Sequence, residues 1–451
     1  MAQPRVVVPR SPLYREAVGI VRTLRESGYE AYLVGGCVRD LLRKVPPKDF
    51  DVATNATPDV VQRVFPKTIP VGVQFGVVLV MRDKVPYEVA TFRTDHGYQD
   101  GRHPDLVVFS TAREDALRRD FTINGLFWDP LAKRVIDEVG GQADLKRRVI
   151  RAIGDPERRF QEDKLRMLRA VRFAAGLGFA MDPATWDAVV RHAEEIVVVS
   201  QERIRDELVK LFTGPNRGRG LDLLAQSGLL KAILPELDAT QGVQQPPEFH
   251  PEWDVFIHTR MLLDLLKGLT PTLAFSALLH DVGKPPTFQI RDRIRFDGHD
   301  RVGAAMSRVI CQRLRFSNED SEKIVMAVGN HMRFKDVQRM RVSTLKRMLR
   351  QPNFAEELAL HRADCLASHK QLDNWRFLRR KLKEFSAPQA LKPTPLITGT
   401  DLLAAGYPEG PQIGQILRAV EEQQLEGTIQ GRAEALELVR REFPTPQVKH
   451  T

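Results

Sequence analysis

The sequence predicts an α+β domain at the start of the chain, followed by helices up to its end. Strand and helix patterns alternate up to about residue 154, after which strand signals fade and helical periodicity dominates. A chain of 451 residues is also too long for one ordinary hydrophobic core. We therefore expect a mixed head over 11–154, a helical neck over 155–240, a second helical domain over 241–385 and a helical tail over 392–445.

Hydrophobic periodicity places the elements of the head. An amphipathic helix is expected over 11–27, because its apolar residues recur at helical spacing. A short apolar strand, 32–34, ends at Gly35 and Gly36, and a helix is expected to begin near Val38. Further strands are expected at Val52, 77–81, 88–92 and 106–109, with a turn at Asp129 and Pro130.

Composition limits the class of protein. No window approaches the ~18 apolar residues of a membrane helix, and the first residues lack the apolar core of a secretory signal. We therefore expect a cytoplasmic protein without a membrane partner. Three cysteines without CxxC spacing argue against disulfides and thiolate zinc sites. The net charge of +10 favours a polyanionic partner, although a solvated basic surface would give the same charge.

The head contains two glycines followed by two carboxylates. Gly35 and Gly36 join a strand to a helix, where backbone N–H groups can approach an anionic ligand; alone, such a pair is an ordinary turn. Asp49 and Asp51 are two residues apart, so in a strand their side chains point to the same side. Adjacent carboxylates repel each other, and Mg²⁺ prefers such oxygen ligands. In this order the two features are typical of nucleotidyl transfer.

Further polar groups follow in the head. Glu88, flanked by apolar residues, is either a third catalytic carboxylate or a surface residue of an edge strand; three acids would hold two metal ions. Arg119, Asp120 and Asn124 could bind a triphosphate and a ribose. They could equally be the ordinary caps and ion pairs of a helix end.

Asp163 and Arg166 lie in the stretch 162–173, which is expected to form one helix. Residues i and i+3 share a helix face, so the pair offers an acceptor beside a donor. Cytosine and adenine both present an exocyclic amine next to a ring acceptor, whereas uracil and guanine present a carbonyl in place of the amine. The pair could therefore select C and A, or it could be a simple helical salt bridge.

Together these motifs resemble the class II enzymes of the tRNA nucleotidyltransferase and poly(A) polymerase family. The similar segments occur in the family's order and cover the first ~210 residues densely; they are 33–40, 48–54, 118–124, 137–141 and 162–173. The resemblance implies a polymerase-β-like head and addition of CCA to tRNA 3′ ends from CTP and ATP, with release of pyrophosphate. The implied partners are the acceptor stem and 3′ end of tRNA, held by basic helices of the body and tail (the segment 397–440 is similar to the family's ending).

The resemblance also implies roles for individual residues. Asp49 and Asp51 would bind catalytic Mg²⁺, with Gly35, Gly36 and Arg39 near the triphosphate and Arg119, Asp120 and Asn124 around the sugar and phosphates. Asp163 and Arg166 would read the base with support from Glu162, and Arg169 would belong to the same nucleotide site. A hinge is implied at 137–141, and Glu202, Arg203 and Glu207 would lie on a neck helix that supports the base-reading pair.

Two features concern the choice among related activities. Bacterial poly(A) polymerases usually carry a basic stretch after the two aspartates, whereas this chain has 70–77, which resembles the tRNA-repair branch. The segment 91–105 resembles the flexible loop that CC-only enzymes lack. Complete CCA addition is therefore favoured, with A-only addition and poly(A) synthesis as alternatives.

Histidines are concentrated after residue 250, around expected helices at 255–266 and 273–279. Their order resembles the metal-dependent phosphohydrolases named for a His-Asp doublet, here His280-Asp281. The resemblance implies a ligand set of His258, His280, Asp281 and Asp364 for Ni²⁺, Mn²⁺ or Mg²⁺, with His299 and His331 available for a second metal ion or a phosphate. The expected activity is hydrolysis of phosphate or cyclic phosphate at RNA ends. The alternatives are a degenerate RNA-binding module and a protein that is primarily a phosphohydrolase; the oligomeric state stays open.

Overall fold

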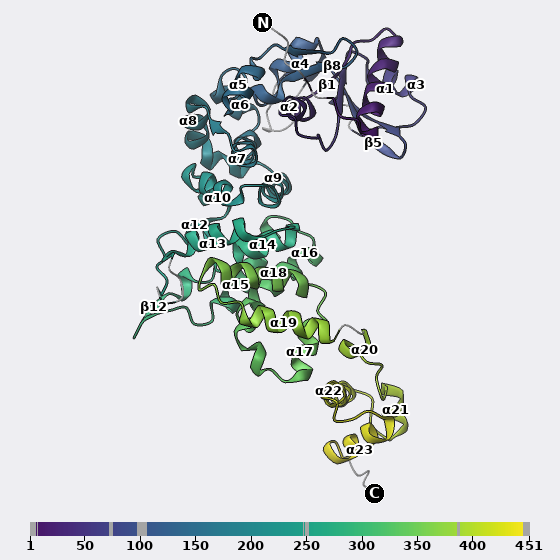
Figure 1. Cartoon of the computed structure of the whole chain (residues 1–451), viewed down its shortest axis with the longest axis vertical. Helices are drawn as coiled ribbons and strands as arrows, with labels where there is room; N and C mark the ends of the chain where they lie inside the picture. The colour runs from purple at the N-terminus through teal and green to yellow at the C-terminus, as the bar shows by residue number, and fades with distance from the viewer. Residues whose placement is uncertain are drawn as a thin grey trace. The chain divides into compact units, whose positions relative to one another are not determined.

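The computed structural model describes residues 6, 8–71, 75–96, 106–246, 248, 252–385 and 388–444. The chain divides into two compact units, 1–239 with 312–316, and 240–311 with 317–451. The strands of the first 140 residues and the helices that follow can be traced along the chain in Figure 1. The predicted α+β head followed by helices is confirmed.

The head is built on a seven-stranded mixed sheet with the order β3-β4-β5-β2-β1-β8-β9. Its strands are β1 (Ala31–Val34), β2 (Asp51–Thr54), β3 (Thr68–Ile69), β4 (Val77–Arg82), β5 (Val85–Thr91), β8 (Leu126–Asp129) and β9 (Arg134–Asp137). Only β2 and β5 pair in parallel; the other neighbours are antiparallel. A separate antiparallel pair is formed by β6 (Arg93–His96) and β7 (Leu106–Phe109).

Alternating side chains cover the two faces of this sheet, as the pleat of a strand requires. Leu33 of β1 packs into the core beneath α1 (Pro12–Glu26) and α3 (Pro58–Val64). Tyr32 and Val34 point to the opposite face, where Ala116 of α4 (Ala112–Leu117) contributes to a smaller cluster. The expected helix 11–27 is confirmed as α1; it begins after Ser11, whose side chain accepts the N–H of Tyr14 at 3.2 Å.

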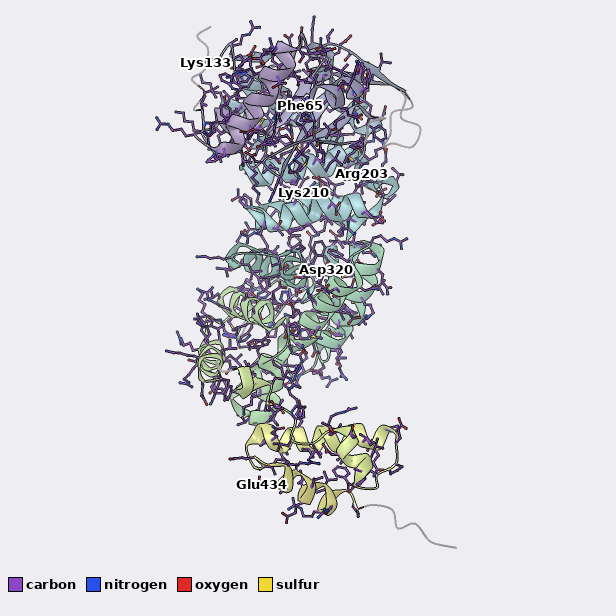
Figure 2. The ribbon with its side chains drawn as sticks, turned by 90° about the vertical axis from the view of Figure 1, so that its right-hand side faces the viewer. Phe65, Lys133, Arg203, Lys210, Asp320 and Glu434 are labelled. Carbon is purple, nitrogen blue, oxygen red and sulfur yellow. The ribbon has the colours of Figure 1, made fainter. Side chains whose placement is uncertain are left out.

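The neck packs helices against the base of the head within the first unit. The remaining elements of this unit are α2 (Gly36–Leu42), α5 (Gly141–Arg147), β10 (Val149–Ile150), α6 (Pro156–Glu162), α7 (Leu165–Leu177), β11 (Ala180–Met181), α8 (Pro183–His192), α9 (Gln201–Thr213), α10 (Arg217–Gln226), α11 (Leu229–Ile233) and α12 (Pro235–Asp238). Helix α7 is packed between α9 and α10. Arg203 and Lys210 lie along α9 (Figure 2).

One expectation for the first unit was wrong, and one hairpin was not predicted. The expected turn at Asp129 and Pro130 is confirmed, and it joins two strands, β8 and β9, that the periodicity did not predict. The stretch 162–173 is not one helix, because α6 ends at Glu162 and Asp163 has an extended backbone (φ −149°, ψ 105°). The Asp163 carboxylate accepts the N–H of Leu165 at 3.1 Å, which satisfies a donor at the start of α7 and favours the break.

The second unit is helical apart from one short hairpin in its described part. Its elements are α13 (Val255–Leu265), α14 (Pro271–Leu279), β12 (Gln289–Ile290), β13 (Ile294–Arg295), α15 (His299–Arg313), α16 (Asn318–Asn330), α17 (Val342–Leu349), α18 (Phe354–Ala367), α19 (Asp373–Glu384), α20 (Pro388–Leu391), α21 (Gly399–Ala404), α22 (Pro411–Glu426) and α23 (Arg432–Glu442). Helix α14 is buried from Thr272 to Leu279 and packs against α13, α16 and α18. None of the described helices is long and apolar enough to span a membrane.

Candidate functional sites

The pairing of β2 with β5 brings Asp51 beside Glu88. Asp51 is the first residue of β2, and Glu88 lies on the neighbouring parallel strand β5, where Val52 is paired with Val89. Both carboxylates therefore project from the face opposite the α1 side of the sheet. The alternative of an edge-strand residue is wrong for Glu88, since β5 lies between β4 and β2. Asp49 is exposed in the segment just before β2, not inside the strand.

The electrostatics of this cluster fit a bound cation. Burial, followed by the charges of Glu88 and Asp49, raises the pKa of Asp51 to about 7, while the charge of Arg119 opposes them. Like charges held this close favour protonation unless a cation neutralises them. Carboxylate oxygens of this kind suit Mg²⁺, which keeps positions for water and for substrate phosphates. The donor set therefore fits a divalent metal.

The glycine turn lies at the same end of the sheet. Val34 pairs with Asp51, so Gly35 directly follows the strand end that faces the carboxylates. Gly35 has φ +72°, a left-handed conformation, and a Cβ added there would lie 3.2 Å from Nη1 of Arg119. Any larger residue would be strained and would press on this guanidinium. Arg119 itself donates to buried Asp115 from Nε at 3.1 Å and from Nη2 at 2.9 Å.

A hydrogen-bonded chain links the start of α2 to α7. Arg39 donates to the side-chain oxygen of Asn124 at 2.8 Å, and the Asn124 amide donates to Asp120 at 3.1 Å. Arg169 donates to the same carboxylate from Nε and Nη2, at 2.9 and 2.6 Å. Burial alone would raise the pKa of Asp120, but Arg169 and Asn124 lower it to about 2. Asp120 and Asn124 therefore position two arginines, and both are buried.

Asp163 and Arg166 do not pair with each other, and each is held by a different residue. Asp163 Oδ2 accepts from Arg203 Nη2 of α9 at 2.7 Å. Arg166 donates from Nη1 to Glu162 at 2.7 Å and to the carbonyl oxygen of Arg159 at 3.1 Å. The simple salt-bridge alternative is therefore wrong for this pair. Both side chains are fixed with hydrogen-bonding capacity to spare, because a carboxylate has about four acceptor positions and a guanidinium has five N–H groups.

Helix α9 also holds α7 through Glu207. This buried carboxylate accepts from Arg172 Nε at 2.5 Å and lies 3.8 Å from Arg169 Nη1. Burial would raise the pKa of Glu207, but Arg172, Arg169 and Lys210 lower it below its ordinary value. The helix that carries Arg166 and Arg169 is thus anchored to α9 at two points, Arg203 and Glu207.

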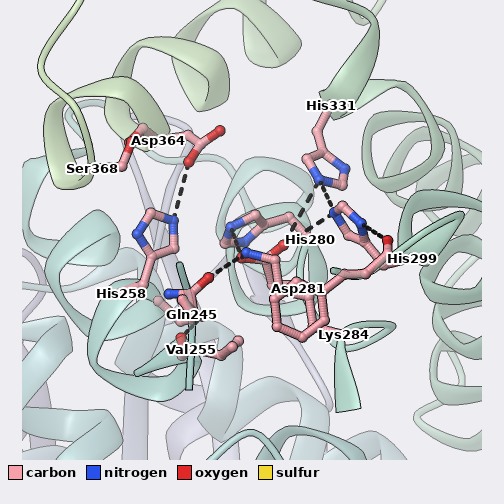
Figure 3. A network of polar contacts seen from close by, with 12 residues as sticks. Gln245, Val255, His258, His280, Asp281, Lys284, His299, His331, Asp364 and Ser368 are labelled. Atoms are coloured by element: carbon pink, nitrogen blue, oxygen red, sulfur yellow. Dashed lines mark hydrogen bonds and ion pairs between the residues drawn. The ribbon is translucent and has the colours of Figure 1, made fainter. Parts of the chain in front are cut away.

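Four histidines of the second unit, His258, His280, His299 and His331, lie around one centre (Figure 3). The Nδ1 atoms of His280, His299 and His331 lie 2.8, 2.8 and 2.6 Å from backbone carbonyl oxygens, and Nδ1 of His258 lies 2.7 Å from Glu252. With Nδ1 engaged outside the cluster, each Nε2 is directed toward its centre. Such a second partner fixes the tautomer and orientation of a metal-binding histidine.

The inward-facing atoms form two adjacent groups that could hold metal ions. One group is His258, His280 and Asp364; the other is Asp281, His299 and His331, and within each group the ligand atoms all lie within 4.8 Å. Asp281 faces both, since its Oδ2 is 3.0 Å from His280 Nε2 and its Oδ1 is 3.6 Å from His299 Nε2. Among the described residues no other three ligand atoms lie this close together, so the carboxylates of Asp49, Asp51 and Glu88 are more widely spaced than either of these groups.

Burial and neighbouring charges shift the pKa values of the histidines in opposite directions. Burial lowers the pKa of His331 to about 4. The pKa of His258 would fall with burial, but Asp364 and Glu252 raise it to about 9. Lys284 is buried and donates to Asp281 at 2.8 Å and to Gln245 at 2.5 Å. A cavity of about 520 Å³ opens onto the cluster and is lined among others by Asp281, His299, His331, Asp364, Lys335 and Arg295.

Sequence reasoning missed some supporting residues. Glu252 and Lys284 are buried partners of the histidine cluster, and Asp115 holds the two arginines of the head. Glu252 lies six residues before His258 in no motif, so no pattern indicated it; Lys284 follows the His-Asp doublet at a helical spacing that could have done so. The segment 91–105 is described only up to His96, where β6 begins at Arg93; residues 97–105 lie outside the described part.

Three segments match models of known domains. Residues 31–151 match the poly A polymerase head domain, 178–241 match a probable RNA- and SrmB-binding site of polymerase A, and 255–368 match the HD domain. A CCA-adding enzyme of Geobacillus stearothermophilus is 48% identical over 227 residues, or 50% of this chain and 56% of that protein. One of Lactobacillus delbrueckii subsp. bulgaricus is 45% identical over 218 residues, or 48% and 55%. The chain thus matches about half the length of these curated relatives.

Solved structures resemble nearly the whole chain. The CCA-adding enzyme of Bacillus stearothermophilus in complex with CTP has a TM-score of 0.74 and 29% identity, covering 96% of this chain and 98% of that one. The Thermotoga maritima CCA-adding enzyme complexed with tRNA shares the fold, with a TM-score of 0.60, 20% identity, and 98% and 99% coverage.

The mixed sheet of the head defines a nucleotidyltransferase fold, to which helical RNA-binding and HD domains are joined. Over these segments the chain is similar to proteins of the tRNA nucleotidyltransferase and poly(A) polymerase family.

Proposed function

We propose that the chain adds CCA to tRNA 3′ ends from CTP and ATP, using Mg²⁺ and releasing pyrophosphate. The relatives named above and the Bacillus stearothermophilus structure are CCA-adding enzymes, and that structure contains CTP. This favours CCA addition over the A-only and poly(A) alternatives. The tRNA acceptor stem and 3′ end are the proposed partners.

The reaction forms a bond from the RNA 3′-oxygen to the α-phosphorus of the nucleotide and breaks the bond to the pyrophosphate. Asp49, Asp51 and Glu88 would hold Mg²⁺, which would lower the pKa of the 3′-hydroxyl and neutralise the leaving pyrophosphate. Arg119 donates a hydrogen bond to Asp115 and lies close enough to Asp51 to lower the pKa of that carboxyl. It would contact the triphosphate. Arg39, Asp120, Asn124 and Arg169 form the network that would keep the sugar and phosphates in place.

One observation carries the choice of base: Asp163 and Arg166 are held apart from each other, by Arg203 and Glu162. Held this way, Asp163 can accept the exocyclic amine of cytosine or adenine while Arg166 donates to the neighbouring ring nitrogen. Uracil and guanine would place a carbonyl oxygen against the carboxylate and leave buried groups unpaired. A protein side-chain pair thereby replaces a nucleic-acid template.

The test uses three tRNA transcripts, ending before CCA, after C and after CC, with each nucleotide singly and with CTP and ATP together. Ordered growth to CCA followed by arrest is expected. Addition of A to the CC-ending tRNA alone would identify an A-adding enzyme, and long A tails would identify a poly(A) polymerase. Asp49→Ala/Asp51→Ala is the matched variant, which should incorporate no nucleotide.

A second function is favoured by the orientation of the four histidines. We propose that the HD domain binds Ni²⁺, Mn²⁺ or Mg²⁺ and hydrolyses phosphate or 2′,3′-cyclic phosphate at RNA ends. In a degenerate module, nothing would maintain the Nδ1 contacts that direct the Nε2 atoms of four histidines, from four separate positions in the chain, toward one centre. The cavity beside the cluster carries basic residues such as Lys335 that could bind a phosphate.

The hydrolysis test supplies a 2′,3′-cyclic nucleotide with each metal ion. We expect hydrolysis by the unmodified chain and none by His280→Ala/Asp281→Ala. Equal rates for the two proteins would contradict an active HD site.

A further inference from the structure

A network of charged side chains surrounds the break between α6 and α7. Lys164, which lies between Asp163 and the first turn of α7, pairs with Glu195 of the 3₁₀ helix that follows α8. The other oxygen of Glu195 lies 2.5 Å from Nδ1 of His192, the last residue of α8. Nε2 of His192 lies 2.5 Å from Glu157 in the first turn of α6. We call Glu157, Lys164, His192 and Glu195 the neck network.

The neck network joins the helices on the two sides of the break. Helix α8 packs against α6, and the 3₁₀ helix after it packs against α7. Asp163 follows the last residue of α6, whereas Arg166 lies in the first turn of α7 and is held by Glu162 of α6. A rotation of α6 relative to α7 would therefore change the spacing between the carboxylate and the guanidinium of the base-reading pair. The network restrains this rotation, because it ties the starts of both helices to the end of α8.

The two cations of the network are largely shielded from water. The side chains of Lys164 and His192 are 12% and 13% exposed, whereas those of Glu157 and Glu195 are 32% and 45% exposed. Ion pairs between fully exposed side chains contribute little, because water and salt screen them. Screening is weaker where the cations are partly buried, and several linked charges hold one another in place better than an isolated pair does.

The contacts of His192 require a proton on each ring nitrogen. Both nitrogens lie 2.5 Å from a carboxylate oxygen, and a neutral imidazole has only one N–H group. Hydrogen bonds to Glu195 and then Glu157 accordingly raise the pKa of His192. The other charged groups here are Lys164, which pairs with Glu195, and Arg191, which pairs with Glu157. When His192 loses its proton, these outer pairs remain, but the link between the two carboxylates is broken.

We propose that the neck network positions Asp163 and Arg166 for base selection, and that a proton on His192 completes it. The inference rests on the proposed function, since it takes these two residues as the base-reading pair. Lys164 and His192 are positioning residues, because they act on the pair through the orientation of α6 and α7. Selection of CTP and ATP over UTP and GTP should therefore weaken as His192 loses its proton.

The choice of readout separates positioning from a merely structural role. If the network only stabilised the fold, its loss would lower the amount of active protein, and incorporation of every nucleotide would fall by the same factor. Metal binding and activation of the 3′-hydroxyl also depend on pH, but they act on all nucleotides alike. A ratio of two rates on one preparation cancels both effects, so only a change in base selection alters it.

The experiment measures kcat/KM for single incorporation of CTP and of UTP into a tRNA transcript that lacks its 3′ CCA, using the full-length protein between pH 6 and pH 8.5. Lys164→Met and His192→Asn interrupt the network at two points, and Lys164→Arg keeps the cation. Lys231→Met is the matched control, because Lys231 is an exposed lysine on α11 of the same unit.

In the unmodified protein, the ratio of CTP to UTP incorporation should fall roughly 3- to 10-fold as pH rises, the range expected for the loss of one hydrogen bond in a charged network. Lys164→Met and His192→Asn should show the lower ratio at every pH, whereas Lys164→Arg and Lys231→Met should keep the profile of the unmodified protein. A ratio that is independent of pH in the unmodified protein, or is unchanged in Lys164→Met, would overturn the inference alone. Failure of the unmodified protein to incorporate CTP at any pH would instead refute the proposed function, and the inference with it.

Discussion

Glu88 and Asp51 lie side by side on two neighbouring parallel strands, and the repulsion between their carboxylates favours the binding of a cation. We expect Glu88→Gln to reduce nucleotide incorporation by ~100-fold or more, because a metal ligand and a charge opposite the reacting phosphate are lost. The same change should stabilise the metal-free protein, since the pKa of Asp51 would fall toward its ordinary value. Incorporation rates and thermal unfolding without metal measure the two effects, with exposed Glu26→Gln as the control.

The sign of the pH dependence follows from the raised pKa of Asp51. The unfolded chain loses this proton near pH 4 and the metal-free folded chain near pH 7. The free energy of unfolding should therefore fall as pH rises between these values, because the folded state holds more protons there. In Glu88→Gln this decline should be shallower. An unchanged pH profile would show that Glu88 does not act on Asp51.

Glu252 acts on the metal cluster through His258. Its carboxylate lies 2.7 Å from His258 Nδ1, and both side chains are buried. We expect Glu252→Gln to weaken metal binding by the second unit by ~10- to 100-fold, since the negative partner of the histidine is lost while its shape is kept. Metal content after dialysis and calorimetric titration would measure the change. Exposed Glu248→Gln, four residues away, should retain the affinity of the unmodified protein.

Whole elements could be predicted where a period or a spacing was clear. The strand 32–34 with its two glycines and the helices 11–27, 255–266 and 273–279 were all expected from the sequence. The hairpin of β8 and β9 was missed because β8 is buried at every position and so shows no alternation, and no motif like the two glycines after β1 marks either strand. The break at Asp163 was missed because it depends on one side-chain hydrogen bond, which leaves no mark on periodicity.

The residues of the candidate sites also fall into a group that motifs predicted and a group that they did not. Motif spacing indicated the carboxylates, the glycines and the histidines, which are close in sequence to a strand end or a helix end. The partners that orient them come from distant segments: Arg203 reaches Asp163 from 40 residues away, and Arg169 reaches Asp120 from 49. Such pairs depend on how helices pack, which residue patterns alone do not show; for Arg203, only the family resemblance implied that its helix supports the base-reading pair.

Helix α9 should determine base selection through its contact with Asp163. In Arg203→Met the carboxylate loses its 2.7 Å bond and can turn. Discrimination of CTP and ATP against UTP and GTP should then fall roughly 10- to 100-fold, the range expected for losing a hydrogen bond between charged groups. Single-nucleotide incorporation measures it. Arg205→Met is the matched control on the same helix, because Arg205 pairs with Asp206 and not with Asp163.

Three elements of the neck meet at His192, which ends α8. Its Nε2 lies 2.5 Å from Glu157 of α6, and its Nδ1 lies 2.5 Å from Glu195, which also pairs with Lys164. Hydrogen bonds to Glu195 and then Glu157 raise the pKa of His192, against the effect of burial. The stabilisation should be complete below pH ~6.5 and lost as pH rises through the raised pKa.

The measurement for His192 is the unfolding temperature of the unmodified protein and of His192→Asn at pH 6 and pH 9. The difference between the two proteins should be larger at pH 6. Exposed His369→Asn should show no such trend. A difference that grew with pH would mean that neutral His192 is the stabilising form.

At the scale of the whole molecule, the two candidate sites lie in different compact units, each with its own core and its own acidic or histidine cluster. Substitutions at sites that share no partners usually have independent effects. Asp49→Ala/Asp51→Ala should therefore abolish nucleotide incorporation and leave hydrolysis of a cyclic nucleotide within about twofold of the unmodified rate. His280→Ala/Asp281→Ala should do the reverse. Both reactions are measured on the same preparation of full-length protein. Loss of both activities in either variant would mean that the head and the HD domain form one catalytic system, and the assignment of separate reactions to the two units would have to be abandoned.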